Sequence, residues 1–196
     1  MLASVGTVIL IVLASLAGVL LLAFGGLLLL ASRLSRAIEA LMAEDAKDPT
    51  RAWLQVAFGF INYRDPAHAS GDIACQASLR RDWSIENRAD LLARADRLQQ
   101  MMSANPAWHG TRLINMLRIG AGAGYLKPEE SWQRALEAGR ILQAAYTSWE
   151  AVAEAMNGAL DSQKGEWVVS AKKSLADNLT QLTQSNYRGV KYETQL

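Results

Sequence analysis

Cysteine and histidine are scarce in this chain of 196 residues, which contains one Cys and two His. Cys75, His68 and His109 cannot build a zinc site of the usual Cys/His type, so neither a metal nor another cofactor is expected. A lone thiol fits a reducing cytoplasm. The net charge is only +1, and no Lys/Arg block with interleaved aromatic residues occurs, which argues against a nucleic-acid partner.

Charge is absent from residues 1–32, because the first charged side chain is Arg33. As a helix, the apolar core from about Val5 to Ala31 rises roughly 40 Å, more than a hydrocarbon layer of about 30 Å. A cleaved signal peptide would need a basic residue before a shorter apolar run. A buried core helix rarely stays uncharged for so long. The segment therefore predicts a transmembrane anchor over residues 1–32, with the lipid bilayer as a partner.

Basic residues follow this apolar segment and none precedes it. Arg33, Arg36, Lys47 and Arg51 lie on its C-terminal side, which predicts a cytoplasmic location for the rest of the chain. Within the segment, small residues recur along one stripe, which would allow a second helix to approach closely. A homodimer through this stripe is therefore a possible assembly; its residues are Ala14, Gly18 and Gly25.

The apolar residues after Arg33 recur at helical spacing, and no segment alternates as a strand would. We therefore expect an all-α chain, with one N-terminal transmembrane helix followed by a compact multi-helix globular domain. Residues 33–48 should form an amphipathic juxtamembrane helix, 49–184 the helical domain and 185–196 a loose tail. Asp48-Pro49 predicts the cap and first position of a helix, and Ser84 is expected to cap a helix running to about Met102.

Several ordered motifs resemble an uncharacterised bacterial domain family numbered 1266, over roughly residues 72–170. They are Trp108-His-Gly-Thr-Arg112, Gly124-Tyr125-Leu126-Lys-Pro-Glu129-Glu130-Ser-Trp132, Leu142-Gln-Ala-Ala-Tyr146-Thr-Ser148-Trp149-Glu150 and Asn157-Gly158. The resemblance implies no activity, cofactor or catalytic residue, because none is established for the family. Its members often carry an acidic residue where this chain has His109. With the predicted anchor, the resemblance leads us to expect a bacterial inner-membrane protein.

Candidate binding residues gather around Trp108, His109 and Arg112. Because His109 and Arg112 lie three positions apart, they can share one helix face and grip an anionic group. A structural alternative pairs Arg112 with Glu129 or Glu130. Tyr125, Trp132 and Trp149 complete the candidate ligand- or partner-binding set, although Trp residues near helix starts also fit a structural role. No catalytic residue is proposed, since no nucleophile with an orienting acid is evident.

Three functions follow as hypotheses. The leading one is a membrane-anchored cytoplasmic helical module that binds another protein and has no evident catalysis. The second narrows this to an immunity or adaptor protein for a secreted bacterial toxin. The third is an enzyme or small-ligand sensor that uses a pocket containing His109 and Arg112, with a polar group from another helix nearby.

Overall fold

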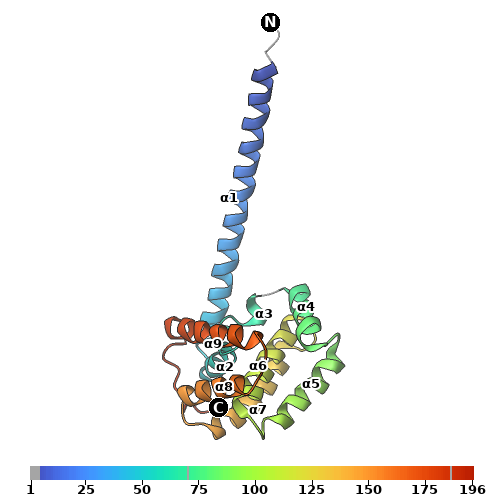
Figure 1. Ribbon diagram of the computed structural model, residues 1–196. Helices are drawn as coiled ribbons and strands as arrows, with labels where there is room; N and C mark the ends of the chain where they lie inside the picture. The colour runs from blue at the N-terminus through green and yellow to red at the C-terminus, as the bar shows by residue number, and fades with distance from the viewer. Residues whose placement is uncertain (1–4, 70, 186) are drawn as a thin grey trace. The chain divides into compact units, whose positions relative to one another are not determined.

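The computed structural model describes residues 5–69, 71–185 and 187–196, with side chains described except at 5–19, 21, 66 and 69. Within these residues the chain is all-α and contains no strand, which confirms the all-α part of the prediction. The helices, shown in Figure 1, are α1 (Val5–Asp45), α2 (Pro49–Gly59), α3 (Pro66–Ala69), α4 (Asp72–Trp83), α5 (Arg88–Met101), α6 (Pro106–Gly122), α7 (Pro128–Ala145), α8 (Trp149–Asp161) and α9 (Trp167–Gln184).

The transmembrane prediction needs correction. Among the described residues, none of the helices is both long enough and apolar enough to cross a membrane. This finding overturns the single-pass anchor at residues 1–32 and the inner-membrane location inferred from it. Residues 1–4 of that predicted anchor lie outside the described residues.

The predicted dimer stripe falls largely on residues whose side chains are not described, namely Ala14 and Gly18. At Gly25, a Cβ atom would meet nothing within 4 Å. A homodimer through this stripe stays a prediction.

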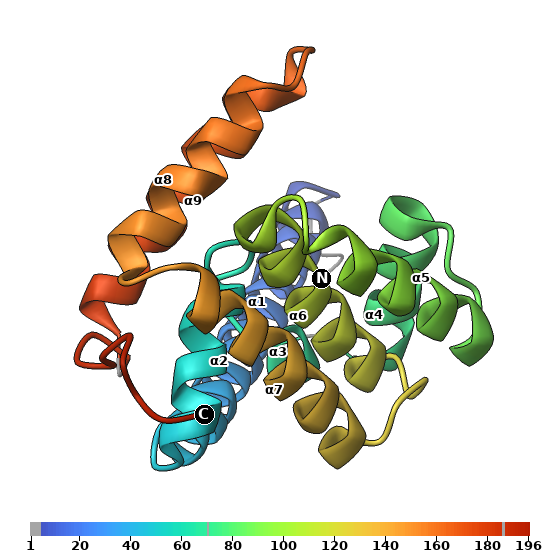
Figure 2. The ribbon, with the colours of Figure 1, turned by 90° about the horizontal axis from the view of Figure 1, so that it is seen from below.

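The chain divides into two compact units, residues 1–40 and 41–196. The second unit is built around α6, which contacts α2, α3, α4, α5, α7 and α8. Seen from below, α8 and α9 lie side by side beyond α2 (Figure 2). Because α6 has neighbours on every side, its residues from Leu113 to Gly120 are all buried. Polar side chains on this stretch therefore need a reason to be there.

Local sequence signals explain several helix ends. The Asp48 carboxylate accepts hydrogen bonds from the backbone N–H groups of Thr50 and Arg51 at 2.9 and 3.1 Å, and Pro49 opens α2, as predicted. Ser84 behaves differently from the prediction. It ends α4 in the left-handed conformation, with φ +55°, and Asn87 caps α5 instead. The Ile85 N–H donates to the Leu79 carbonyl at 3.1 Å and closes α4, so Ser84 belongs to the end of α4 and not to the start of α5.

In the described part of the predicted loose tail, residues 185 and 187–196, two tyrosines are buried in the core. Tyr187 and Tyr192 are 3% and 4% exposed. The Tyr187 hydroxyl donates to the Met42 carbonyl at 3.0 Å, and the Tyr192 hydroxyl donates to the Leu142 carbonyl at 2.8 Å. The indole N–H of the fully buried Trp53 donates to the Tyr192 carbonyl at 2.8 Å. Buried aromatic rings with paired polar atoms tie this segment to the core, which an unpatterned sequence did not reveal.

Candidate functional site

Arg112, on α6, lies between two indole rings. Its guanidinium carbon is 4.7 Å from the centre of the Trp83 ring on α4 and 4.9 Å from that of Trp108 on α6. Such contacts stabilise a cation by its attraction to the negative ring faces. Among the described residues, no ion pair involves Arg112, and Glu130 pairs instead with Arg88 and Arg134 at 2.8 and 3.4 Å. The structural alternative of an Arg112–Glu130 pair is therefore not realised.

A cleft of roughly 600 Å³ opens on one side of Arg112. Its wall comes from α4, α6, the α8–α9 turn and α9, and includes Trp83, Trp108, Asn115 and Trp167. Asn115 is 2% exposed, and its Nδ2 atom is buried without a hydrogen-bond partner in the structure. A buried unpaired amide costs about 1–3 kcal/mol. The cleft therefore combines a cation, aromatic surfaces and a donor that lacks an acceptor.

A second hollow of roughly 290 Å³ contains Arg112, His109, Arg94 and Arg97 in its wall. Asp82 also borders it, but that carboxylate pairs with Arg81 at 2.7 Å. Burial, and then the charge of Arg94, lower the pKa of Arg112 from its ordinary value. Burial, and then Arg112, lower the pKa of His109, whose Nδ1 atom is buried without a partner. This hollow therefore gathers uncompensated positive charge.

The other predicted site residues lie elsewhere. The Tyr125 hydroxyl donates to the Glu86 carbonyl at 2.6 Å and ties the α6–α7 turn to the α4–α5 turn. Trp149 packs on Trp53 with ring centres 4.7 Å apart, and its indole N–H donates to the Val190 carbonyl at 3.0 Å. The structure thus brings together Trp108, His109 and Arg112 but separates them from Tyr125 and Trp149.

Trp132, the remaining predicted residue, borders a polar cluster that the sequence analysis missed. The Arg118 guanidinium carbon lies 3.7 Å from the Trp132 ring centre. Arg118 Nε donates a hydrogen bond to Asp65 Oδ2 at 3.0 Å, Arg118 Nη2 lies 2.9 Å from the same oxygen in an ion pair, and both side chains are buried. Arg118 also donates to Ser131 Oγ at 3.3 Å. This buried pair is therefore well provided with partners.

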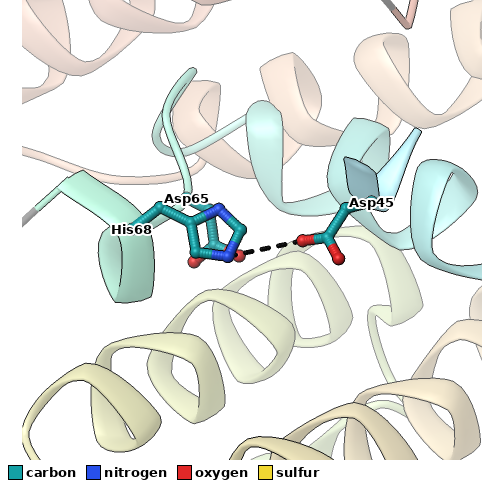
Figure 3. Close-up of side chains that lie close together, drawn as sticks. All are labelled: Asp45, Asp65 and His68. Atoms are coloured by element: carbon teal, nitrogen blue, oxygen red, sulfur yellow. Dashed lines mark ion pairs between the residues drawn. The ribbon is translucent and has the colours of Figure 1, made fainter. Parts of the chain in front are cut away.

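Asp45 and His68 extend the cluster, as Figure 3 shows with their side chains pointing toward one another. His68 Nε2 lies 3.4 Å from Asp45 Oδ2, and Gln55 Nε2 lies 3.2 Å from both Asp45 Oδ2 and Asp65 Oδ2. Arg51 pairs with the other Asp45 oxygen at 3.0 Å. We call Asp45, Gln55, Asp65 and His68 the carboxylate–histidine cluster. Its Asp and His groups are of the kind that bind divalent cations.

One signal could have pointed to this cluster. Arg118 lies among apolar core residues of α6, Leu117 and Ile119 on either side, and a charged residue there requires a buried partner. The sequence does not say which carboxylate provides it. Asp65 precedes Pro66 and reads as an ordinary turn residue, and it does cap α3 by accepting from the Ala67 N–H at 2.8 Å.

Residues 99–192 match a family model described as protein of unknown function (DUF1266). This confirms the resemblance found in the sequence, although the matched segment begins and ends later than residues 72–170. The match includes Trp108, His109, Arg112 and Arg118, whereas Asp45, Asp65 and His68 precede it. No curated protein matches the chain, and no solved structure does.

Proposed function

We propose that this protein binds a small anionic molecule, with Arg112 as the main contact for a phosphate or carboxylate group. The observation that carries the proposal is the Arg112 guanidinium, placed between Trp83 and Trp108 beside a cleft, with no ion pair to any described carboxylate. A guanidinium that is half-buried without a counter-charge gains most from an incoming anion, since its planar fork matches carboxylate and phosphate oxygens.

The surroundings of Arg112 indicate what else the ligand carries. Arg94, Arg97 and His109 supply further donors on one side, which suits an anion of more than one charge. Asn115 offers an unpaired amide N–H on the other side, which suits a hydrogen-bond acceptor on the ligand body. Trp83, Trp108 and Trp167 offer surfaces for an apolar or planar part. A phosphate monoester or a carboxylate that carries a ring therefore fits this site better than a bare inorganic ion.

The test is a titration of the purified full chain with inorganic phosphate, phenyl phosphate and benzoate, followed by calorimetry and by tryptophan fluorescence. We expect phenyl phosphate to bind more tightly than inorganic phosphate. Arg112→Met should weaken phenyl phosphate binding by about 10- to 150-fold, because a hydrogen bond to a charged group contributes about 1.5–3 kcal/mol. The matched control is Arg134→Met, which removes an Arg from the exterior of α7 and should leave the affinity unchanged.

A second variant separates binding from folding. Asn115→Leu should weaken phenyl phosphate binding while leaving the unliganded protein at least as stable, because it removes an unsatisfied buried amide. Equal affinities for wild type, Arg112→Met and Asn115→Leu would refute the assignment. So would the absence of binding by all three anions.

Protein binding, the leading interpretation of the sequence, is the second candidate and has one observation in its favour. A largely apolar groove of roughly 280 Å³ runs beside Phe60, Trp149, Leu182 and Val190. Pull-down of the full chain, compared with a Leu182→Glu variant that retains its helical content, would test it. No partner above background, or the same partners with both proteins, would count against protein binding. The immunity or adaptor role stays a prediction.

A further inference from the structure

The carboxylate–histidine cluster lies apart from the Arg112 site, and its residues come from α1, α2, α3 and the turn before α3. We infer that it is a binding site for a first-row divalent cation such as Zn²⁺ or Mn²⁺, with Asp45, Asp65, His68 and Gln55 as ligands. One ligand atom from each of Asp45, Asp65 and His68 lies within 4.8 Å of the others. A mixed imidazole and carboxylate set suits this class of metal rather than Ca²⁺ or Mg²⁺.

The spacing of the donor atoms fits a small cation. Ligands about 2.1 Å from a tetrahedral metal lie about 3.4 Å apart. His68 Nε2 and Asp45 Oδ2 are 3.4 Å apart, and Gln55 Nε2 is 3.2 Å from oxygens of both carboxylates. A cation between these groups would therefore require small side-chain adjustments and no rearrangement of the helices.

Gln55 provides the independent observation. Its residue is 1% exposed, and its Oε1 atom is buried without a hydrogen-bond partner in the structure. The two ends of a side-chain amide exchange places by a half-turn about the last bond. That turn would bring Oε1 against both carboxylate oxygens, which is unfavourable by itself and favourable when a cation lies between the three. A bound cation thus gives the orphaned oxygen a partner and completes four ligands, while the amide nitrogen gives up its two carboxylate contacts and takes the position that Oε1 leaves.

The residues around the cluster act as outer partners of the ligands. Arg118 fixes Asp65 through a hydrogen bond and an ion-pair contact to one oxygen, and Arg51 fixes the far oxygen of Asp45. Carboxylate ligands of metals are commonly oriented in this way. The two guanidinium groups also repel a cation, so we expect moderate rather than very tight affinity. A hollow of roughly 300 Å³ beside Asp45 and His68 gives access, and Glu44 and Glu129 border it.

The experiment uses the full chain, treated with a chelator and then titrated with Zn²⁺ and Mn²⁺ by calorimetry. We expect saturable binding of one ion per chain. His68→Gln and Asp45→Asn should each weaken it by about 100-fold or more, beyond the 10- to 100-fold typical of outer partners. Gln55→Met should weaken it less. The control is His109→Gln, which removes the other histidine and should leave the affinity unchanged.

Nitrogen-15 NMR of the imidazoles gives a readout that does not depend on affinity. Because the chain has only two histidines, Zn²⁺ should shift the His68 ring nitrogens and leave those of His109 in place. Circular dichroism in the absence of metal checks that each variant is folded. Binding that is unchanged in His68→Gln and Asp45→Asn would overturn the inference. So would Zn²⁺ shifts at His109 alone, or no saturable binding of either ion.

Discussion

Replacing Arg118 by Met should strongly destabilise the second unit of the chain. Arg118 and Asp65 are 2% and 0% exposed at their side chains, and a hydrogen bond of 3.0 Å and an ion-pair contact of 2.9 Å join them. Met keeps most of the apolar stem beside Trp132 but leaves the Asp65 carboxylate buried without its cation. Since water cannot reach that charge, the loss is far larger than for a surface pair.

The expected magnitude follows from comparable buried pairs. Removing one partner of such a pair costs about 3–5 kcal/mol. A domain of this size loses about 2–4 °C of melting temperature per kcal/mol, so the midpoint should fall by roughly 6–20 °C. The partly exposed pair Arg134–Glu130, at 3.4 Å with side chains 35% and 26% exposed, offers the comparison. Arg134→Met should cost about 0.5 kcal/mol or less.

The assay is urea and thermal unfolding followed by circular dichroism, with a chelator present so that no bound metal contributes. The double variant Asp65→Asn with Arg118→Met removes both charges, and Asn still caps α3. It should be several kcal/mol more stable than the sum of the two single changes predicts. If Arg118→Met costs no more than Arg134→Met, or if the single effects simply add, the buried pair does not have the energetic role inferred from its geometry.

Two further predictions concern α6. Gly120→Ala should lower the free energy of unfolding by about 1–3 kcal/mol, because the new Cβ would lie 2.5 Å from Leu91 Cδ2 in a closely packed core. The control is Gly158→Ala on α8, where a Cβ would meet nothing within 4 Å. It should raise the free energy of unfolding by about 0.5–1 kcal/mol in the same urea titrations. NMR titration should find the pKa of His109 below its ordinary 6.5, because burial and the charge of Arg112 disfavour the imidazolium. The contribution of His109 to folding stability is therefore complete above about pH 6.5 and is lost as the pH falls below that value. Phosphate bound at Arg112 should move that pKa upward. A pKa of 6.5 or more without phosphate, or equal effects of the two Gly changes, would contradict these expectations.

Helix content and several caps followed from the sequence because they depend on near neighbours. Asp48 and Pro49 act within one turn, so their pattern was sufficient. Ser84 was misassigned because Ser suits both an N-cap and a helix exit. The choice was made by the Ile85 N–H, which donates to the Leu79 carbonyl at 3.1 Å and closes α4. Local chemistry allowed both outcomes, and the helix exit that formed is the one that leaves Ile85 buried, at 1% exposure.

The candidate sites could be predicted from the sequence to different degrees, for the same reason. His109 and Arg112 share one helix turn, so their spacing placed them together. Trp83, the second ring that contacts Arg112, belongs to α4, and only the tertiary structure brings it next to Arg112. The carboxylate–histidine cluster was not predicted at all, since its members are spread over α1, α2, α3 and a turn. Its members also do not fit the Cys/His pattern on which the expectation of no metal rested.

The central position of α6 gives a physical reason to separate structural from functional polar groups. Burying an amide or a charge is tolerated when partners replace water. Arg118 meets this condition through Asp65, Ser131 and the Trp132 ring. Asn115, one turn earlier on the same helix, does not, because its Nδ2 finds no acceptor in the structure. Leu at this position would avoid that cost. The unpaired Nδ2 of Asn115, in the wall of the same cleft as Arg112, supports the proposed ligand, which would accept its hydrogen bond.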